Sequence, residues 1–209
     1  MKGLFFTFGK YFDYTFIYLI HMKRIAIFAS GSGTNAENII HYSRQNKTFE
    51  VVKIYCNKPT AGIIEKANKL DVAVEIFSRN LFYNGNYIAH DLTLNAIDFV
   101  VLAGFLWLIP ESILNVYSNK MVNIHPALLP KFGGKGMYGM KVHEAVKTNG
   151  ETETGITIHK VNMEYDRGEI LFQAKCDVHS VDTAESIAQK IHHLEYEHFP
   201  KIIDLFVNQ

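Results

Sequence analysis

The chain has 209 residues, of which 48 % are hydrophobic and 20 % charged, a balance typical of one globular domain with a sizeable core. Its 21 Lys and Arg residues equal its 21 Asp and Glu residues, so no basic surplus suggests a nucleic-acid or membrane surface. The two cysteines, Cys56 and Cys176, are too few for a disulfide framework and favour a reducing, cytoplasmic setting.

Residues 1–21 are strongly apolar and aromatic, but Lys10 and Asp13 interrupt them. A membrane span needs about 20 consecutive apolar residues, and no small-residue cleavage site of a signal peptide follows. The pattern of a folded domain starts at Met22, so we predict one domain over residues 22–209. We interpret residues 1–21 as a dispensable extension or a mis-assigned start, and we expect no membrane anchor.

Strand-like and helix-like segments alternate from Lys23 onward. Short apolar runs typical of buried strands lie at residues 24–28, 51–56, 73–76, 97–103 and 121–125. Helices are predicted between them at residues 34–43, 60–70, 87–96 and 110–117, and residues 78–85 are predicted to form a loop. Strands that alternate with helices predict an α/β fold with a doubly wound, mostly parallel sheet and helices on both faces.

The pattern changes after Lys131. The elements predicted here are a glycine-rich loop at 132–139, a helix at 141–147, strands at 154–161 and 170–177, and a last helix to 207 capped by Asp182 or Thr183. Two long strands in succession end the strict alternation of strand and helix.

A glycine-rich turn, Ser30-Gly31-Ser32-Gly33-Thr34-Asn35-Ala36, follows the first strand and matches the dinucleotide-binding pattern G-x-G-x-x-A. A dinucleotide site also needs an acidic residue at the end of the second strand, which here ends in Cys56-Asn57-Lys58. Glycines let the backbone approach an anion, and free amides at the start of a helix point toward it. We therefore predict a phosphate site, with a tight turn as the alternative, and a helix cap at Thr34 or Asn35.

Two polar residues, Asn123 and His125, alternate with apolar residues in the strand at 121–125, so both point to one face. Pro126 ends the ladder, and ligands of open α/β sheets bind at the carboxyl ends of the strands. An amide can donate to a carbonyl oxygen that gains charge, and an imidazole can donate or move a proton near neutral pH. The pair predicts acyl chemistry; the alternative is that both side chains only satisfy loop backbone.

The segment N-I-H-P-A-L-L-P-K-F, residues 123–132, closely resembles the signature of the folate-dependent formyltransferases, and within them the branch that acts on glycinamide ribonucleotide. The resemblance covers about residues 22–209. It implies a Rossmann-like fold and transfer of the formyl group of 10-formyltetrahydrofolate to the amine of 5-phosphoribosylglycinamide, in de novo purine synthesis.

The resemblance also implies individual roles. Catalysis would rest on Asn123, His125 and Asp166, with His159 in support. The residues implied for the ribonucleotide are Gly33, Thr34, Asn35 and Glu195, and those implied for the folate are Leu106, Trp107, Leu108, Ile109 and Asn123. Trp107 stands where many members have an arginine, and a second family arginine aligns with Gly85, so the way the folate tail is held stays open.

Each of these positions also has a plainer interpretation. Asp166 with Gly168 is ordinary turn chemistry, and Glu195 can be a solvated helix position. His125, His159 and Asp166 can form a metal triad, although the chain has no C-x-x-C or H-E-x-x-H motif, and we predict no metal.

Alternative functions are a formyltransferase for methionyl-tRNA or an amino-sugar nucleotide, a formyltetrahydrofolate hydrolase, and a nucleotide-binding redox module. The first usually adds a basic face and the second a further domain. We expect small-molecule substrates, no nucleic-acid or membrane partner, a cytoplasmic location, and a monomer or weak homodimer.

Overall fold

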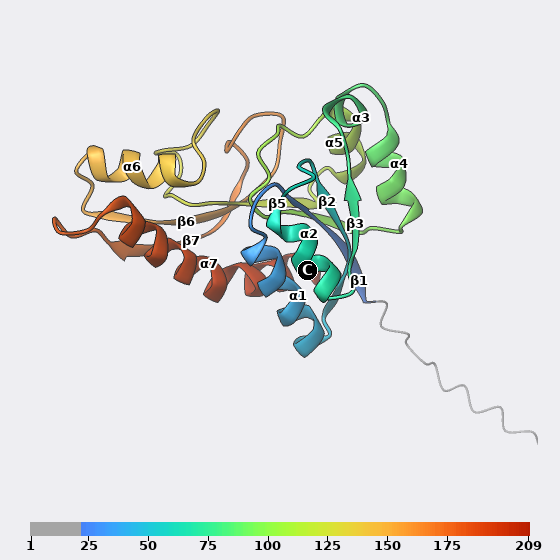
Figure 1. Ribbon diagram of the computed structural model, residues 1–209, viewed down its shortest axis with the longest axis horizontal. Coiled ribbons are helices and arrows are strands. Elements are labelled where there is room, and N and C mark those ends of the chain that lie inside the picture. Colours follow the sequence, from blue (N-terminus) through green and yellow to red (C-terminus); the bar gives the residue numbers. More distant parts are fainter. Residues whose placement is uncertain (1–21) are drawn as a thin grey trace, which may run out of the picture.

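The computed structural model describes residues 22–209, so the predicted extension at residues 1–21 lies outside the described residues. These residues form one seven-stranded sheet in the order β3-β2-β1-β4-β5-β6-β7 (Figure 1). The strands are β1 (Lys23–Ala29), β2 (Phe49–Cys56), β3 (Ala73–Ile76), β4 (Phe99–Leu102), β5 (Met121–His125), β6 (Glu153–Lys160) and β7 (Ile170–Asp177). The helices are α1 (Thr34–Asn46), α2 (Gly62–Lys69), α3 (Arg79–Tyr83), α4 (Tyr87–Leu94), α5 (Glu111–Tyr117), α6 (Met140–Thr148) and α7 (Ala184–Val207).

The sheet combines a parallel and an antiparallel part. Strands β3, β2, β1, β4 and β5 pair in parallel, whereas β5 with β6 and β6 with β7 pair antiparallel. The chain runs outward from β1 to β3 and then returns to β4 on the other side of β1. This reversal creates a switch point between β1 and β4, where ligands of doubly wound sheets bind. The predicted doubly wound, mostly parallel α/β fold is confirmed.

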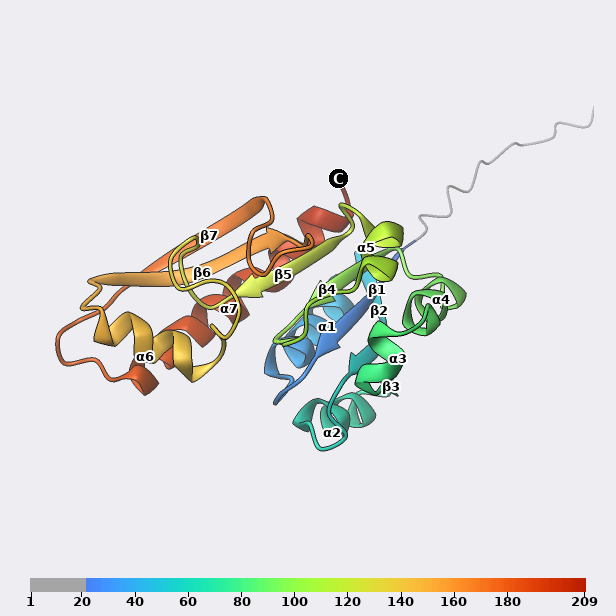
Figure 2. The same cartoon turned by 90° about the horizontal axis from the view of Figure 1, so that it is seen from above.

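Helices cover both faces of the sheet (Figure 2), and a hydrophobic core lies beneath each layer of helices. Along β1, Ile25 and Ile27 belong to the core beneath α1, α2 and α7, whereas Ala26 and Phe28 belong to the core beneath α3, α4 and α5. This division follows from the alternation of side chains along a strand. Each large apolar side chain that is fully buried contributes about 1.5–3 kcal/mol, so the central strand is held rigidly from both sides.

One prediction about a connecting segment is wrong. Residues 78–85, expected to form a loop, contain the short helix α3, because the hydroxyl of Ser78 accepts a hydrogen bond from the amide of Leu81 at 3.3 Å. The helix also buries Phe82, whose ring centroid lies 5.1 Å from that of Phe77 and 5.5 Å from that of Phe105. Aromatic packing and a serine cap therefore order a segment that its local sequence did not mark as helical.

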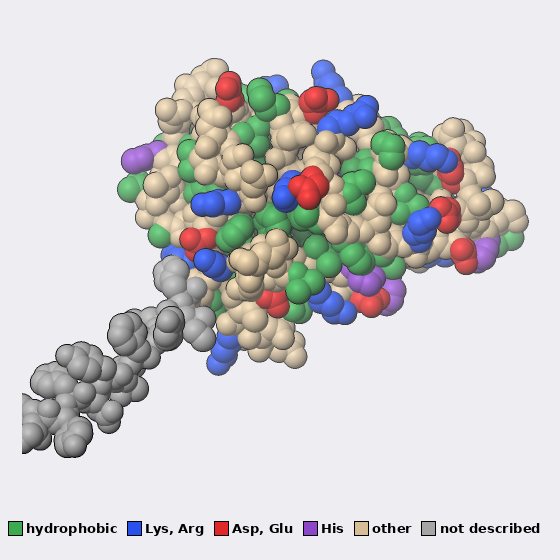
Figure 3. Space-filling view, turned by 180° about the vertical axis from the view of Figure 1, so that it is seen from behind, with side chains coloured by type: hydrophobic (Ala, Val, Ile, Leu, Met, Phe, Trp, Pro, Cys, Tyr) green, Lys and Arg blue, Asp and Glu red, His purple; other side chains and the backbone are tan. Residues whose placement is uncertain are grey.

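The surface carries both signs of charge. On the face shown in Figure 3, Lys and Arg side chains are scattered among Asp and Glu rather than gathered into one basic area. No helix within residues 22–209 is long and apolar enough to span a membrane. Both cysteines are free thiols, Cys56 buried and Cys176 half-buried.

Candidate active site

A cavity of about 630 Å³ opens at the carboxyl ends of β1, β4 and β5, at the switch point of the sheet. Its lining comes from the glycine loop at 30–35, the segment after β4, the loops at 134–139 and 165–166, and α6 and α7. The volume lies within the range of about 300–1,000 Å³ that ligand pockets occupy. The predicted polar side chains of β5 thus lie in a cavity large enough for two small substrates.

Asn123 and His159 face each other across β5 and β6, where they are register partners. Nδ1 of His159 lies 2.8 Å from the Lys160 carbonyl oxygen and donates its proton there, so Nε2 carries the lone pair. The amide Nδ2 of Asn123, 3.0 Å from that Nε2, donates to it. The other amide hydrogen points to Asp166 across a long 3.5 Å contact and is the one that can turn to a ligand oxygen.

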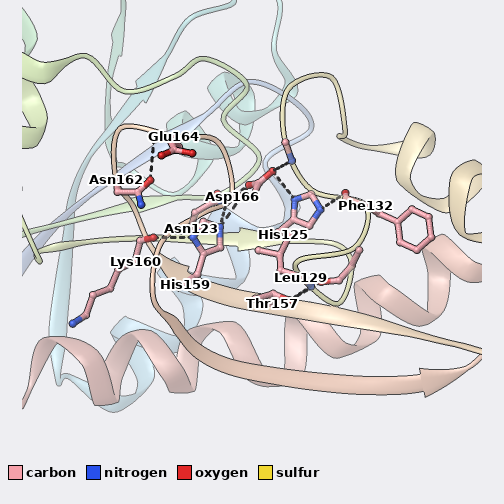
Figure 4. A network of polar contacts seen from close by, with 12 residues as sticks. Asn123, His125, Leu129, Phe132, Thr157, His159, Lys160, Asn162, Glu164 and Asp166 are labelled. Atoms are coloured by element: carbon pink, nitrogen blue, oxygen red, sulfur yellow. Dashed lines mark hydrogen bonds and ion pairs between the residues drawn. The ribbon is translucent and has the colours of Figure 1, made fainter.

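His125 is almost fully buried, with 3 % of its surface exposed. Its Nε2 lies 2.8 Å from the carbonyl oxygen of Phe132, which can only accept, so Nε2 carries the proton. Its Nδ1 faces Oδ2 of Asp166 at 3.5 Å (Figure 4). Burial lowers the pKa of His125, although the charge of Asp166 opposes this effect. Near neutral pH the imidazole is therefore neutral and offers its Nδ1 lone pair.

Asp166 joins the two histidines. Its Oδ2 accepts a hydrogen bond from the amide of Gly134 at 2.8 Å, and its Oδ1 lies 3.6 Å from Nε2 of His159. Burial alone would raise the pKa of Asp166, but pairing with His159 and His125 when these are protonated, together with the Gly134 amide, holds it below its ordinary value. The carboxylate is thus ionised and can stabilise a positive charge on His125. Asn123, His125 and Asp166 line the cavity together, and His159 lies behind Asn123 and Asp166.

The glycine loop leads directly into α1. Gly33, not Thr34 or Asn35, occupies the N-cap position, with φ at +74°, and no side chain caps the helix, so that prediction is wrong. The Asn35 side chain donates instead to Oε2 of Glu195 at 3.0 Å, because α7 packs beside the start of α1. The first amides of α1 therefore remain without a helical partner and can bind an anion at the cavity.

Glu195 on α7 is 5 % exposed, which excludes the plainer interpretation of a solvated helix position. Its Oε2 accepts from Asn35 and also pairs with Nδ1 of His192 at 2.9 Å. The hydrogen bond with Glu195 raises the pKa of His192. The sequence analysis did not select His192 for this site, although a spacing of three residues on a helix places it beside Glu195.

Only part of the segment after β4 lines the cavity. Leu106 and Trp107 line the cavity, whereas Leu108 and Ile109 do not. Ile109 is buried in the core beneath α5, and the Leu108 carbonyl accepts a hydrogen bond from the Tyr83 hydroxyl at 3.0 Å. Of the four residues of this segment that were predicted to bind the folate, Leu106 and Trp107 are thus the two placed for side-chain contact with a ligand.

Arg79 is a further cavity residue that the sequence analysis missed, because it lies on α3, where a loop was expected. Its guanidinium carbon stands 4.9 Å from the ring centroid of Tyr83 and 5.5 Å from that of Trp107. These cation–π contacts hold a positive charge at the cavity. The separation of four residues between Arg79 and Tyr83 becomes meaningful only once the segment is known to be helical.

The same cavity contains Lys58, at the end of β2, and His143 on α6. Lys58 adds positive charge close to the glycine loop, as an anion site requires. Within the part of the chain that the structure describes, no group of three His, Cys, Asp or Glu side chains is arranged to hold a metal ion.

A family model described as formyl transferase matches residues 23–203. The chain therefore belongs to the formyl transferase family, which sets aside the redox module considered above.

Relatives from within this family are similar to most of the chain. A phosphoribosylglycinamide formyltransferase of Bacillus subtilis is 34 % identical over 187 residues, covering 87 % of this chain and 93 % of the relative. The chloroplastic phosphoribosylglycinamide formyltransferase of Arabidopsis thaliana is 37 % identical over 187 residues, covering 87 % of this chain. The chain spans 64 % of this plant relative and 61 % of a second one, from Vigna unguiculata.

A solved structure shares the fold. The crystal structure of phosphoribosylglycinamide formyltransferase from Bacillus halodurans superimposes with a TM-score of 0.80 at 34 % identity, over 90 % of this chain and 96 % of that chain. The similarity therefore includes both the parallel and the antiparallel part of the sheet.

Proposed function

We propose that this chain transfers the formyl group of 10-formyltetrahydrofolate to the amine of 5-phosphoribosylglycinamide. The products are formylglycinamide ribonucleotide and tetrahydrofolate, a step of de novo purine synthesis leading to IMP. The observation that carries the proposal is the convergence of Asn123, His125 and Asp166 at one cavity, with Asp166 3.5 Å from each of the other two. The names of the relatives support the choice of substrates.

The acceptor substrate lies on the α1 side of the cavity. Its phosphate is bound by the free amides that follow Gly33, at Thr34 and Asn35, with Lys58 as a positive charge. The ribose hydroxyls donate to the carboxylate of Glu195, whose Oε1 is left over from the contacts with Asn35 and His192. This placement directs the amine of the substrate toward β5.

The folate lies on the α3 side, against Leu106 and Trp107. Arg79 binds a carboxylate of the folate tail, since its guanidinium is held over aromatic rings at the cavity. Trp107 and Gly85 stand where the family has arginines. Arg79 thus supplies the positive charge that is missing at these two positions. Asn123 approaches the formyl group from the strand beneath.

The reaction moves one proton from the attacking amine to the departing folate nitrogen. The amine attacks the formyl carbon, and the former carbonyl oxygen becomes negative and accepts a hydrogen bond from the Asn123 amide. Nδ1 of His125 takes the proton of the amine, and the Asp166 carboxylate stabilises the imidazolium that forms. Nδ1 then returns the proton to the folate nitrogen as its bond to carbon breaks, while His159 keeps the Asn123 amide in place.

The test measures formyl transfer with purified wild-type protein, 10-formyltetrahydrofolate and 5-phosphoribosylglycinamide, and folate hydrolysis without acceptor. We expect rapid transfer, slow hydrolysis and no transfer to methionyl-tRNA. His125→Ala should lose most of the transfer activity and remain folded, whereas His193→Ala, on an exposed histidine of α7 away from the cavity, should match the wild type. Hydrolysis that equals transfer, or a fully active His125→Ala, would contradict the proposal.

The location and assembly of the protein are part of the same proposal. We expect a cytoplasmic monomer or weak homodimer that uses no metal and contacts neither nucleic acid nor membrane. Sedimentation at several concentrations measures the assembly, and activity after dialysis against a chelator measures the need for a metal. A tight oligomer or loss of activity on dialysis would require revision.

A further inference from the structure

A row of polar side chains crosses the antiparallel part of the sheet. His125 on β5 is the register partner of Thr157 on β6, and Thr157 is the register partner of Gln173 on β7. Gln173 is exposed and does not line the cavity. It therefore cannot touch the substrates, and its contacts must explain any influence it has on them.

Gln173 and Thr157 hold one residue of the loop that follows β5. The side-chain amide of Gln173 donates to the Leu129 carbonyl at 3.1 Å and to the Thr157 hydroxyl at 2.9 Å. That hydroxyl accepts from the Leu129 amide at 3.0 Å and donates to the Ala127 carbonyl at 2.6 Å. Leu129 is thus fixed at both its N–H and its carbonyl, in a region where Thr157 is fully buried.

From Leu129 the constraint continues to the candidate catalytic pair. Gly133 packs directly on Leu129, since a Cβ at Gly133 would come within 2.5 Å of the Leu129 side chain. On either side of Gly133, the Phe132 carbonyl accepts from His125 Nε2 at 2.8 Å, and the Gly134 amide donates to Asp166 at 2.8 Å. A displacement of Leu129 therefore moves the partners of both His125 and Asp166.

The tautomer of His125 depends on this arrangement. The Phe132 carbonyl favours a proton on Nε2, whereas the Asp166 carboxylate, 3.5 Å from Nδ1, favours a proton on Nδ1. If the carbonyl moves away, neutral His125 places its proton on Nδ1 to donate to Asp166. Nδ1 then has no lone pair with which to accept a proton from the amine.

We propose that Gln173 is a positioning residue that holds His125 in the Nε2–H tautomer through Leu129 and Phe132. The inference rests on the proposed role of His125 as proton acceptor. It adds that Gln173 determines that Nδ1 of His125 is the nitrogen that accepts the proton. Gln173 acts at a distance, through the backbone of the loop, and has no part in binding either substrate.

The experiment compares Gln173→Met, which keeps the length of the side chain and removes both donors, with Gln189→Met on an exposed position of α7. Nitrogen-15 NMR of the histidine rings measures the tautomer without substrate, and steady-state kinetics measures kcat and both KM values. We expect Gln173→Met to shift His125 toward the Nδ1–H form and to lower kcat about 10- to 100-fold with unchanged KM values. Gln189→Met should match the wild type.

One result would overturn the inference: a wild-type tautomer in Gln173→Met, whatever its kcat or melting temperature. If Gln173→Met does not fold, Gln173→Glu has nearly the same shape, cannot donate to the Leu129 carbonyl when ionised, and should give the same two changes. Failure of the proposed function is recognised separately, because a wild type without transfer activity still reports its His125 tautomer.

Discussion

Two glycine-rich segments line the same cavity, and the structure uses glycine differently in each. In the segment at 30–35, a Cβ on Gly33 would come within 2.7 Å of the backbone of Ile63, and the amide of Ile63 donates to the Gly31 carbonyl at 3.2 Å. In the segment at 134–139, Gly136 also has positive φ, at +91°, but a Cβ there would meet nothing within 4 Å. Glycine is required at Gly33 by both packing and positive φ, and at Gly136 by backbone conformation alone.

The histidines on the two sides differ as well. His125, on the transfer side, is buried among Asp166, His159 and Glu195, and burial lowers its pKa. His192, on the acceptor side, is half-exposed, and Glu195 raises its pKa. The comparison contrasts a glycine turn that packs tightly on Ile63 with a buried histidine whose pKa is lowered by its burial.

The largest expected effect is a loss of kcat without a change in acceptor binding. Asn123→Ala should lower kcat by about 3–4 kcal/mol of transition-state stabilisation, because it removes an amide donor to the oxygen that gains charge. The KM for the acceptor should stay near the wild-type value, since Asn123 lies on β5, two strands away in the sheet from β1, which the glycine loop follows. Steady-state kinetics with both substrates measures this, and near-normal turnover would exclude the oxyanion role.

The next effect tests the packed segment. Gly33→Ala should lower the free energy of unfolding by roughly 2–5 kcal/mol, which sums backbone strain at positive φ and overpacking against Ile63. It should also raise the KM for the phosphorylated acceptor while folate binding stays nearly intact. Urea unfolding and separate titrations with the acceptor and a folate analogue measure both parts. Equal weakening of the two ligands would show that this loop does not belong to the acceptor alone.

The matched change in the open segment should be milder. Gly136→Ala should lower the free energy of unfolding by about 1–2 kcal/mol, from the positive φ alone, because no atom lies where the Cβ would be placed. Urea unfolding beside Gly33→Ala measures the difference. A loss as large as that of Gly33→Ala would mean that the two segments are constrained alike.

The smallest expected effect is a pair of opposite pH dependences. The folded-state pKa of His125 lies below its ordinary value of 6.5, so its contribution to stability is complete above pH 6.5 and is lost as the pH falls toward the folded-state pKa. The folded-state pKa of His192 lies above its ordinary value of 6.5. The stability from its pair with Glu195 is therefore fully present below pH 6.5 and is lost as the pH rises through the folded-state pKa.

Urea unfolding between pH 5 and pH 8 measures these dependences, and solvent screening keeps that of half-exposed His192 small. In a plot of the free energy of unfolding against pH, His125→Gln should flatten the acid limb, and Glu195→Gln should flatten the alkaline limb. If Glu195→Gln alters the acid limb instead, the assignment of the two histidines to opposite sides would be wrong.

Much of the site could be predicted because its signals are local. The alternation that places Asn123 and His125 on one face is a property of any strand, and the glycine loop is recognisable from the short chain between β1 and α1. The prediction of α3 as a loop failed because Phe82 packs against the rings of Phe28 and Phe105, which lie far away in the chain. Arg79, which lies on that helix, was missed for the same reason.

The sequence by itself determined the α/β alternation, the family, and the residue types at the ends of β1 and β5, because strand periodicity and short motifs act over a few neighbouring residues. Only the tertiary structure decided that Glu195 is buried against Asn35, that Asp166 stands between His125 and His159, and that the His125 proton lies on Nε2. These features depend on contacts between residues far apart in the chain, and on burial that changes how each group ionises. Such contacts exist only when the strands and helices have packed together.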